Sequence, residues 1–351
     1  MSKQSQAVSL AEEYYDSPEA DAFYLNVWGG EDIHVGCYED TDDIGAAGVE
    51  TVDRMAGLLS NPGPDSMVVD LGAGYGGSAR RLASAHGCKV TCVNISETQN
   101  ANNRAKNRQT GLDRQIHVIH GSFDDVPMPA ESADVVWSQD AFLHAPDRRK
   151  VIEEAFRLLK PGGELVFTDP MQTDDVPDGV LQPVYDRLNL RDLGSMRFYR
   201  EAAQDIGFEV LDQIDLVHNL RTHYDRVRQE LESRRSELEQ KSSADYLDKM
   251  VVGLRNWVEA ADQGERDEGD GREGDRELGR RHRASDHDAE AGGDLALTTG
   301  TDARAHLADG PHLIGHRSDG AIGPTVRRCP WEQHRKQEDA DATEAPRVIC
   351  D

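Results

Sequence analysis

Residues 70–77 combine a carboxylate with a glycine-rich turn. Gly72, Gly74 and Gly77 fit G-x-G-x-x-G, a pattern that several kinds of nucleotide-binding protein share. The charge of Asp70 would repel a pyrophosphate but would attract a cation. Because glycines let a ligand approach the backbone closely, the turn predicts a site for a sulfonium with its attached ammonium group, as in S-adenosylmethionine. The alternatives are a dinucleotide and a tight strand-to-helix turn that binds nothing.

A histidine that could handle a proton follows a later apolar run, in the segment WSQDAFLH at 137–144. His144 comes after the fourth predicted strand, which places it at the mouth of a ligand crevice. Histidine is the side chain whose ordinary pKa lies nearest to neutral pH. The alternative interpretation is a histidine at the start of a helix, without chemistry.

The segments that must position these residues alternate between apolar runs and helical patterns. Strands are predicted at 66–71, 88–96, 115–123, 133–139 and 164–170, and one of the helices is predicted at 147–159. This alternation indicates a parallel sheet covered on both faces, which is a doubly wound α/β domain. Because ligands bind such domains at the carboxyl ends of the strands, we expect the site at 71–77, 94–99, 121–123 and 138–144.

The composition excludes several classes of partner. The 351 residues carry 39 Lys+Arg against 66 Asp+Glu, a net charge of −27, which disfavours nucleic acid and anionic membranes. No apolar run approaches the roughly 18 residues of a membrane helix and the chain starts without an apolar signal core, so we expect a soluble, cytoplasmic protein. Five scattered cysteines and histidines without ligand spacing predict free thiols and no metal site. We expect a monomer or a small homo-oligomer.

The character of the chain changes after Gly264. Of the 20 aromatic residues, all but Trp331 lie before that point, and the first 264 residues carry 26 basic and 46 acidic groups, so the domain itself is acidic. Residues 265–351 contain 12 arginines and one lysine and show no periodicity, so we expect a disordered polar tail. A frameshift product is the second interpretation, because an out-of-frame reading of a GC-rich gene gives such a composition.

The segment VVDLGAGYGG at 68–77 resembles the first motif of class I S-adenosylmethionine-dependent methyltransferases, and the resemblance extends over about residues 9–261. It implies a Rossmann-like sheet that binds S-adenosylmethionine. In such proteins the second strand usually ends in an acidic residue that accepts both ribose hydroxyls, but Asn94 stands here. Phe123 would stack on the adenine; the alternative is a core aromatic. The residues implied to bind the cofactor are Trp28, Ile33, His34, Asp70, Gly72, Ala73, Gly74, Gly76, Asn94, Ile95, Gln99, Ser122, Phe123 and Gln139.

Two further segments, at 23–36 and 127–147, are similar to the small-amine methyltransferases that form glycine betaine from sarcosine and dimethylglycine. They read FYLNVWGGEDIHVG and PMPAESADVVWSQDAFLHAPD. A more distant resemblance, to phosphoethanolamine methyltransferases, implies that Tyr15 pairs with His144 and that both are catalytic. These resemblances imply methyl transfer to the nitrogen of sarcosine and dimethylglycine. Glycine or phosphoethanolamine as the acceptor, and a protein that binds the cofactor without catalysis, are the alternatives.

The expected substrate makes demands that other segments could meet. An amine with a pKa of about 10 must lose its proton before it attacks, and His144 or Tyr15 could accept the proton or relay it to water. A helical lid at 1–60 would exclude water, and the face of Tyr24 would hold a methylated ammonium. An insertion at 171–200 would cap the substrate, and it contains Arg191 and Arg197 as candidates for binding the carboxylate. The alternative for each arginine is a solvated side chain.

Class I methyltransferases usually complete their sheet with a last strand that inserts antiparallel. Residues 208–216 predict the sixth strand, but the polar tail begins where relatives have an aromatic-rich strand. We therefore expect either a sheet without its last antiparallel strand or a frameshift product. A chain without that strand should fold less stably than a relative with the full sheet.

Overall fold

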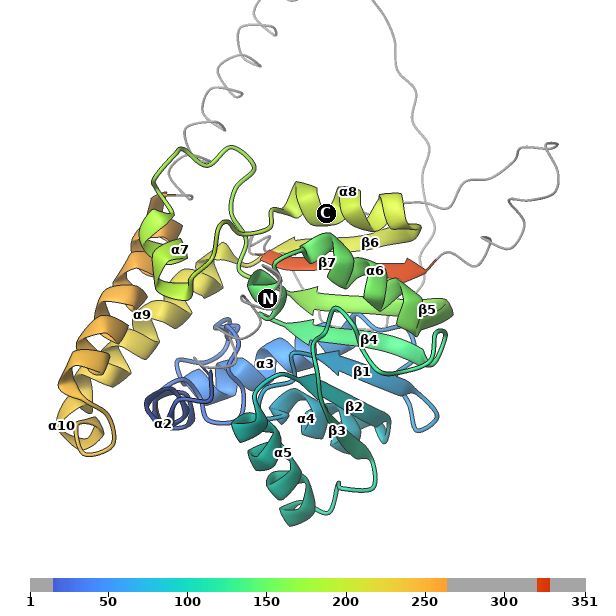
Figure 1. The fold of residues 1–351 in the computed structure, drawn as a ribbon, viewed down its shortest axis with the longest axis horizontal. Helices are drawn as coiled ribbons and strands as arrows, with labels where there is room; N and C mark the ends of the chain where they lie inside the picture. The colour runs from blue at the N-terminus through green and yellow to red at the C-terminus, as the bar shows by residue number, and fades with distance from the viewer. Residues whose placement is uncertain (1–14, 264–320, 329–351) are drawn as a thin grey trace, which may run out of the picture. The chain divides into compact units, whose positions relative to one another are not determined.

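The computed structural model describes residues 15–263 and the strand at 321–328. Seven strands form one sheet in the order β3-β2-β1-β4-β5-β7-β6 (Figure 1). The first five pair in parallel, as predicted, and β7 runs antiparallel to both of its neighbours. The strands are β1 (Met67–Leu71), β2 (Lys89–Asn94), β3 (Ile116–His120), β4 (Ala133–Gln139), β5 (Leu159–Thr168), β6 (Phe208–Asp215) and β7 (Ala321–Arg328).

Helices cover both faces of this sheet, which confirms the doubly wound α/β class. Side chains of α6 and α8 join the apolar core on one face, and those of α3 and α4 join the core on the other. The helices are α2 (Pro18–Asn26), α3 (Ile44–Gly57), α4 (Gly77–His86), α5 (Glu97–Gln109), α6 (Arg148–Leu158), α7 (Gln182–Leu188), α8 (Met196–Ile206), α9 (Val217–Ser233) and α10 (Arg235–Leu238), followed by helical residues 244–263. No helix in the described part of the chain is long and apolar enough to cross a membrane.

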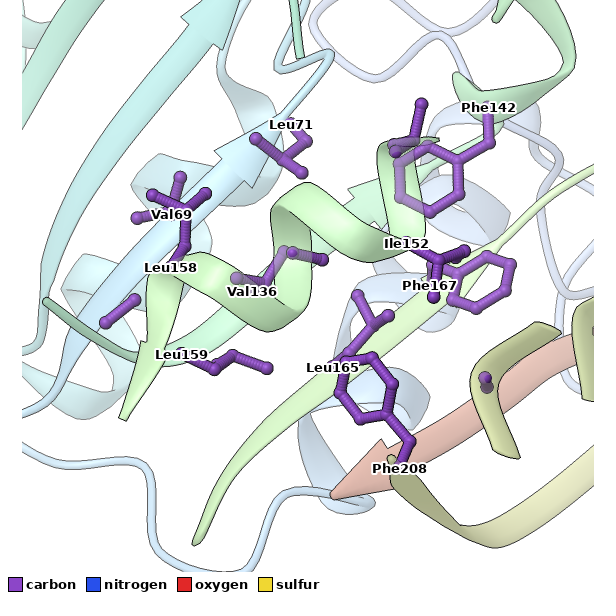
Figure 2. Close-up of a cluster of buried hydrophobic side chains, with 14 of the residues drawn as sticks. Val69, Leu71, Val136, Phe142, Ile152, Leu158, Leu159, Leu165, Phe167 and Phe208 are labelled. Carbon is purple, nitrogen blue, oxygen red and sulfur yellow. The ribbon is translucent and has the colours of Figure 1, made fainter. Parts of the chain in front are cut away.

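Helix α6 shows how the sequence produces one of these layers. Asp147 caps its first turn by accepting a hydrogen bond from the backbone N–H of Lys150. Apolar residues recur on one face of the helix and pack over β1, β4 and β5 (Figure 2). The buried residues of this face are Val151, Ile152, Ala155 and Leu158. The predicted helix at 147–159 is therefore confirmed.

A separate apolar cluster lies at the carboxyl ends of the strands. It joins α2, α7, α9 and the helical residues 244–263, and it includes Tyr75 and Leu143, which follow β1 and β4. Figure 1 shows α2, α7 and α9 beyond the arrowheads of β4 and β5. The segments expected to form a lid and a substrate cap thus pack at the edge of the sheet where ligands bind in this topology.

Strand β7 corrects the prediction that the sheet lacks its last antiparallel strand. It lies between β5 and β6, where Val326 pairs with Leu165 on one side and with Val210 on the other. The sequence AIGPTVRR did not indicate a strand, because it has no aromatic residue and contains glycine and proline. The register with β6 shifts next to Pro324, which cannot donate to the ladder. The disorder predicted for the rest of 265–351 lies outside the described residues.

We expect a chain that ends after Gly320 to be less stable than a chain that ends after Arg328. The shorter chain lacks β7, so β5 and β6 each lose a partner and expose unpaired backbone groups. Its thermal midpoint should fall by about 5 °C or more, since ~1 kcal/mol corresponds to about 2–4 °C in a domain of this size. Circular dichroism melts of the two chains measure the difference, and equal midpoints would show that β7 contributes nothing.

Candidate active site

A pocket of about 720 Å³, part of it open to solvent, lies at the carboxyl ends of β1 to β4. Its lining comprises Tyr15, Ile33, Gly72, Gly74, Asn94, Ile95, Gln99, Ser122, Phe123, Gln139, Asp140, Ala141, His144 and Pro146. The sequence analysis named all of these except Asp140, Ala141 and Pro146, and the first two of the three lie in its expected stretch 138–144. The structure therefore brings most of the predicted site together.

A smaller pocket of about 280 Å³ adjoins the first and shares Ile33, Gly72 and Gln139 with it. Asp70, His34 and Ala73 line this pocket, so three more predicted residues lie at the site. Gly77, from the glycine pattern, also lines it, and the lining residues that the sequence analysis missed are Glu31, Asp32 and Ser78. Acidic side chains thus predominate at this end of the site.

Gly72 brings the loops after β1 and β4 into contact. Its φ is +83°, and a Cβ atom at this position would lie 2.4 Å from the Cβ of Ala141. Its backbone N–H donates to the carbonyl of Val93 at 2.8 Å, which ties the turn to β2. A side chain here would push the loops apart and narrow the space for a ligand.

Asp70 lies 3% exposed at the end of β1. Burial raises the pKa of its carboxyl group to about 7; the nearby His34 opposes the rise and Asp32 adds to it. A buried carboxylate without a bound counter-charge is costly, so this position favours a cation. Burial lowers the pKa of His34, but Asp32, at 3.7 Å, and Asp140 outweigh it, and the pKa of His34 is raised. Acidic and basic groups side by side suit the ammonium and carboxylate of an amino-acid moiety.

Two amides line the next part of the pocket. Asn94 donates from Nδ2 to Oε1 of Gln99 at 3.0 Å, which leaves the other polar atom of each amide available. Nε2 of Gln99 is buried without a hydrogen-bond partner among the described residues, as is Nε2 of Gln139. Orphaned buried donors are costly and fit a ligand that carries hydroxyl groups. Phe123 forms part of the wall and also packs against Phe142, with ring centroids 6.1 Å apart.

Tyr15 and His144 meet at the wall of the large pocket. The phenol oxygen of Tyr15 and Nε2 of His144 are joined by a hydrogen bond of 2.9 Å, and the rings meet edge to face. Burial, with a smaller effect of the Arg148 charge, lowers the pKa of His144 to about 4. The imidazole is therefore neutral at physiological pH. The pairing that the resemblance implied is present in the geometry.

Asp140 lies in the expected stretch 138–144, but sequence reasoning gave it no role. It directly follows β4 and has φ at +50°, a conformation that residues other than glycine rarely adopt. Its carboxylate accepts hydrogen bonds from the backbone N–H of Val35 and the hydroxyl of Thr168, each at 2.7 Å. Burial raises the pKa of its carboxyl group. The available signal was an acidic residue at the end of a strand, four positions before His144.

Tyr24, Trp28 and Gly76 do not line either pocket. Trp28 is 6% exposed and packs against His223 and Tyr224, with ring centroids 5.1 and 5.4 Å away. Tyr24 stands behind Tyr15, at 5.8 Å between ring centroids. These two aromatic residues support the wall of the site from the apolar cluster at the strand ends.

The two predicted arginines lie outside the pocket lining. Arg191 donates to the carbonyl of Pro146 at 3.0 Å, and Arg197 pairs with Asp174 at 3.2 Å. Neither Lys nor Arg is found among the described residues that line the two pockets. Of the two arginines, only Arg191 contacts a lining residue.

The cysteines of the described region are structural. Cys37, Cys88 and Cys92 are free and buried, and all three join the core on the α3 and α4 face, as predicted for packing residues. Residues 15–263 and 321–328 hold no group of three or more His, Cys, Asp or Glu side chains that could bind a metal.

Comparisons with known proteins agree with this geometry. A family described as "Methyltransferase domain" matches residues 69–167. A sarcosine/dimethylglycine N-methyltransferase of Halorhodospira halochloris is 49% identical over 260 residues, which cover 74% of this chain and 93% of the relative. The enzyme of the same name from Aphanothece halophytica is 49% identical over 265 residues, or 75% of this chain and 96% of the relative.

A solved structure shows the same relationship. The crystal structure of a protein assigned as a sarcosine dimethylglycine methyltransferase from Galdieria sulphuraria superposes with a TM-score of 0.66 at 40% identity, over 72% of this chain and 94% of that one. A phosphoethanolamine N-methyltransferase of Haemonchus contortus, at 18% identity and a TM-score of 0.65, shares the fold. The identity to full-length relatives, together with the fold, shows that the chain belongs to the sarcosine/dimethylglycine N-methyltransferase family.

Proposed function

We propose that the protein transfers methyl groups from S-adenosylmethionine to the nitrogen of sarcosine and dimethylglycine and so forms glycine betaine. The observation that carries the proposal is the Tyr15–His144 pair, which lines the same pocket as the amides and glycines that we expect to bind the cofactor. The names of the relatives supply the substrate class. The acidic domain fits a cytoplasmic protein that works in salt, where glycine betaine serves as an osmolyte.

The residues of the two pockets fit the cofactor. Asp70 and Asp32 would hold its cationic amino-acid end, and protonated His34 would hold the carboxylate. The amides of Asn94 and Gln99 would hold the ribose, and Phe123 would stack on the adenine. When bound, S-adenosylmethionine would supply a methyl group on a positively charged sulfur. An amine can attack the methyl carbon in line with the carbon–sulfur bond, and the neutral thioether leaves.

Side chains near His144 would prepare the amine. Asp140 lines the same pocket, and its carboxylate would hold the amine while the amine is still protonated. Because the pKa of His144 is about 4, its ring cannot keep a proton taken from an amine whose pKa is about 10. We therefore propose that the Tyr15–His144 pair orients the amine and relays its proton to water.

The segment ahead of β1 would exclude water from this reaction. It contributes Tyr15, Ile33 and His34 to the walls, and Asp140 holds it in place through the N–H of Val35. Arg191, which contacts the loop at Pro146, is the better placed of the two arginines for the substrate carboxylate. Arg197 is the alternative and would first have to leave Asp174.

Incubation with methyl-labelled cofactor and a panel of glycine, sarcosine, dimethylglycine and phosphoethanolamine tests this function. We expect label transfer to sarcosine and dimethylglycine. Transfer to glycine or phosphoethanolamine alone would assign another small amine. Tight binding of the cofactor without transfer to any of the four would indicate a protein that binds the cofactor and does not catalyse.

The affinity for S-adenosylmethionine should depend on pH. The cation favours ionised Asp70, whose pKa is about 7 before binding, so the dissociation constant should be about 10-fold lower at pH 8 than at pH 6. Isothermal titration calorimetry measures this, and Asp70→Asn should remove the dependence. An affinity that rises toward low pH would instead mean that protonation of His34 dominates, and a constant affinity would contradict the role given to Asp70.

A further inference from the structure

The turn that carries His144 is short and is held from outside. Phe142–His144 form a three-residue 3₁₀ turn without a side-chain cap. Its own backbone bonds are His144 N–H to Ala141 and Ala145 N–H to Phe142. So short a turn gains little from its own hydrogen bonds, and neighbouring groups must fix it. One such group is Phe167, whose ring packs against that of Phe142 with the two ring centroids 5.0 Å apart (Figure 2).

Two side chains, one buried and one partly buried, hold both backbone polar groups of Leu143, the residue before His144. The N–H of Leu143 donates to Oδ1 of Asp169 at 2.9 Å, and its carbonyl accepts from the guanidinium of Arg148 at 3.1 Å. Asp169 directly follows β5 and is 4% exposed. The two peptide groups that flank the Cα atom of Leu143 are thus each held at one polar group, which limits rotation about the backbone of Leu143 and so sets the direction of the next side chain.

Asp169 is itself held by Tyr199. The hydroxyl of Tyr199, on α8, donates to Oδ2 of Asp169 at 2.7 Å, so each carboxylate oxygen has one donor. The ring of Tyr199 is fully buried, packs 5.0 Å from that of Phe167, and lies so close to Gly194 that a Cβ atom there would be 2.4 Å away. This tyrosine is locked in place and keeps one orientation of the carboxylate.

We propose that Tyr199 and Asp169 are a pair of positioning residues that aim the His144 ring at Tyr15 through the backbone of Leu143. The proposal rests on the proposed function only for its kinetic readout. Neither residue lines the pocket, so the pair acts without touching the ligands. Two hydrogen bonds, from Leu143 N–H to Asp169 and from the Tyr199 hydroxyl to Asp169, thereby connect α8 to the turn that carries His144.

The kinetic test is a double-mutant cycle. Tyr199→Phe keeps the ring and removes one hydroxyl. It should lower kcat for dimethylglycine about 10-fold in the wild-type background, with an unchanged KM for the cofactor, and should have no further effect when His144→Ala is already present. Tyr246→Phe, in the helical residues 244–263, removes a hydroxyl far from the turn in the sequence and is the matched control. Equal losses in both backgrounds, or no loss in the first, would overturn the proposal.

A second readout does not depend on turnover, so it separates failure of this proposal from failure of the proposed function. The ring ¹⁵N signals of His144, assigned by their loss in His144→Ala, should shift or broaden in Tyr199→Phe and stay unchanged in Tyr246→Phe. Unchanged signals in Tyr199→Phe would overturn the proposal even if the protein methylates none of the amines. If Tyr199→Phe fails to fold, Asp169→Asn replaces it, because asparagine can still accept from Leu143 and donate to Tyr199. That variant should then keep the His144 signals near their wild-type positions, and displaced signals would contradict the proposal.

Discussion

Replacing His144 by alanine should lower the turnover of dimethylglycine by about 10²-fold or more. The substitution removes the partner of the Tyr15 hydroxyl, 2.9 Å away, and with it the path by which the amine would lose its proton. The loss should appear in kcat and not in KM for the cofactor. His144 lines the large pocket, whereas Asp70, which would bind the amino-acid end of the cofactor, lines the adjoining one. Steady-state kinetics with labelled cofactor measure both parameters.

The pH profile gives this prediction a control. Because the pKa of His144 is about 4, the wild-type rate should show no inflection near pH 6.5, and His144→Ala should lower the rate by the same factor from pH 6 to pH 9. Tyr15→Phe should cause a smaller loss, since His144 itself stays in the pocket wall. Near-normal turnover in His144→Ala would remove this residue from the mechanism.

Replacing Asp70 by asparagine should weaken the binding of S-adenosylmethionine by about 10²-fold or more, because a buried cation then loses its counter-charge. The same change should not destabilise the free protein at pH 8. Burial raises the pKa of Asp70 to about 7 in the folded protein. The free energy of unfolding therefore falls as pH rises from about 4 to 7, because the unfolded chain ionises this carboxyl group first. A neutral amide at this position removes that loss of stability. Calorimetry gives the affinity and thermal melts give the stability.

The matched control is Asp53→Asn. Asp53 pairs with Arg81 on the surface of the same domain, 44% exposed, and lines neither pocket. Its replacement should leave the affinity unchanged. An Asp70→Asn variant that binds the cofactor as tightly as the wild type would contradict the assignment of the carboxylate to a cationic ligand.

Sequence patterns predicted the centre of the site because the topology does most of the positioning. Gly72, Asn94, Ser122 and Gln139 each end or follow a different parallel strand, and such ends meet at one edge of a sheet. Once the apolar runs were recognised as strands, these residues had to converge. Tyr15 is different, since only a resemblance to relatives implied its contact with His144.

What escaped prediction depends on contacts between distant segments. Asp140 stands in the expected stretch 138–144, but its role was missed because that role follows from a positive φ and from its hydrogen bond to Val35, and spacing shows neither. Arg191 and Arg197 were named from charge alone, and local partners hold both outside the pocket lining. Strand β7 was missed because its glycine and proline interrupt the residue pattern typical of a strand. The edges of β5 and β6 with which it pairs exist only in the folded sheet.

The position of β7 has a consequence for biosynthesis. Val326 pairs with Leu165 across a very long stretch of sequence, so the sheet cannot close until residues 321–328 have left the ribosome. Until then the nascent protein presents the open side of β5 to its surroundings, where strands of other chains could add. The excess of negative charge in the first 264 residues would keep such growing chains apart by mutual repulsion.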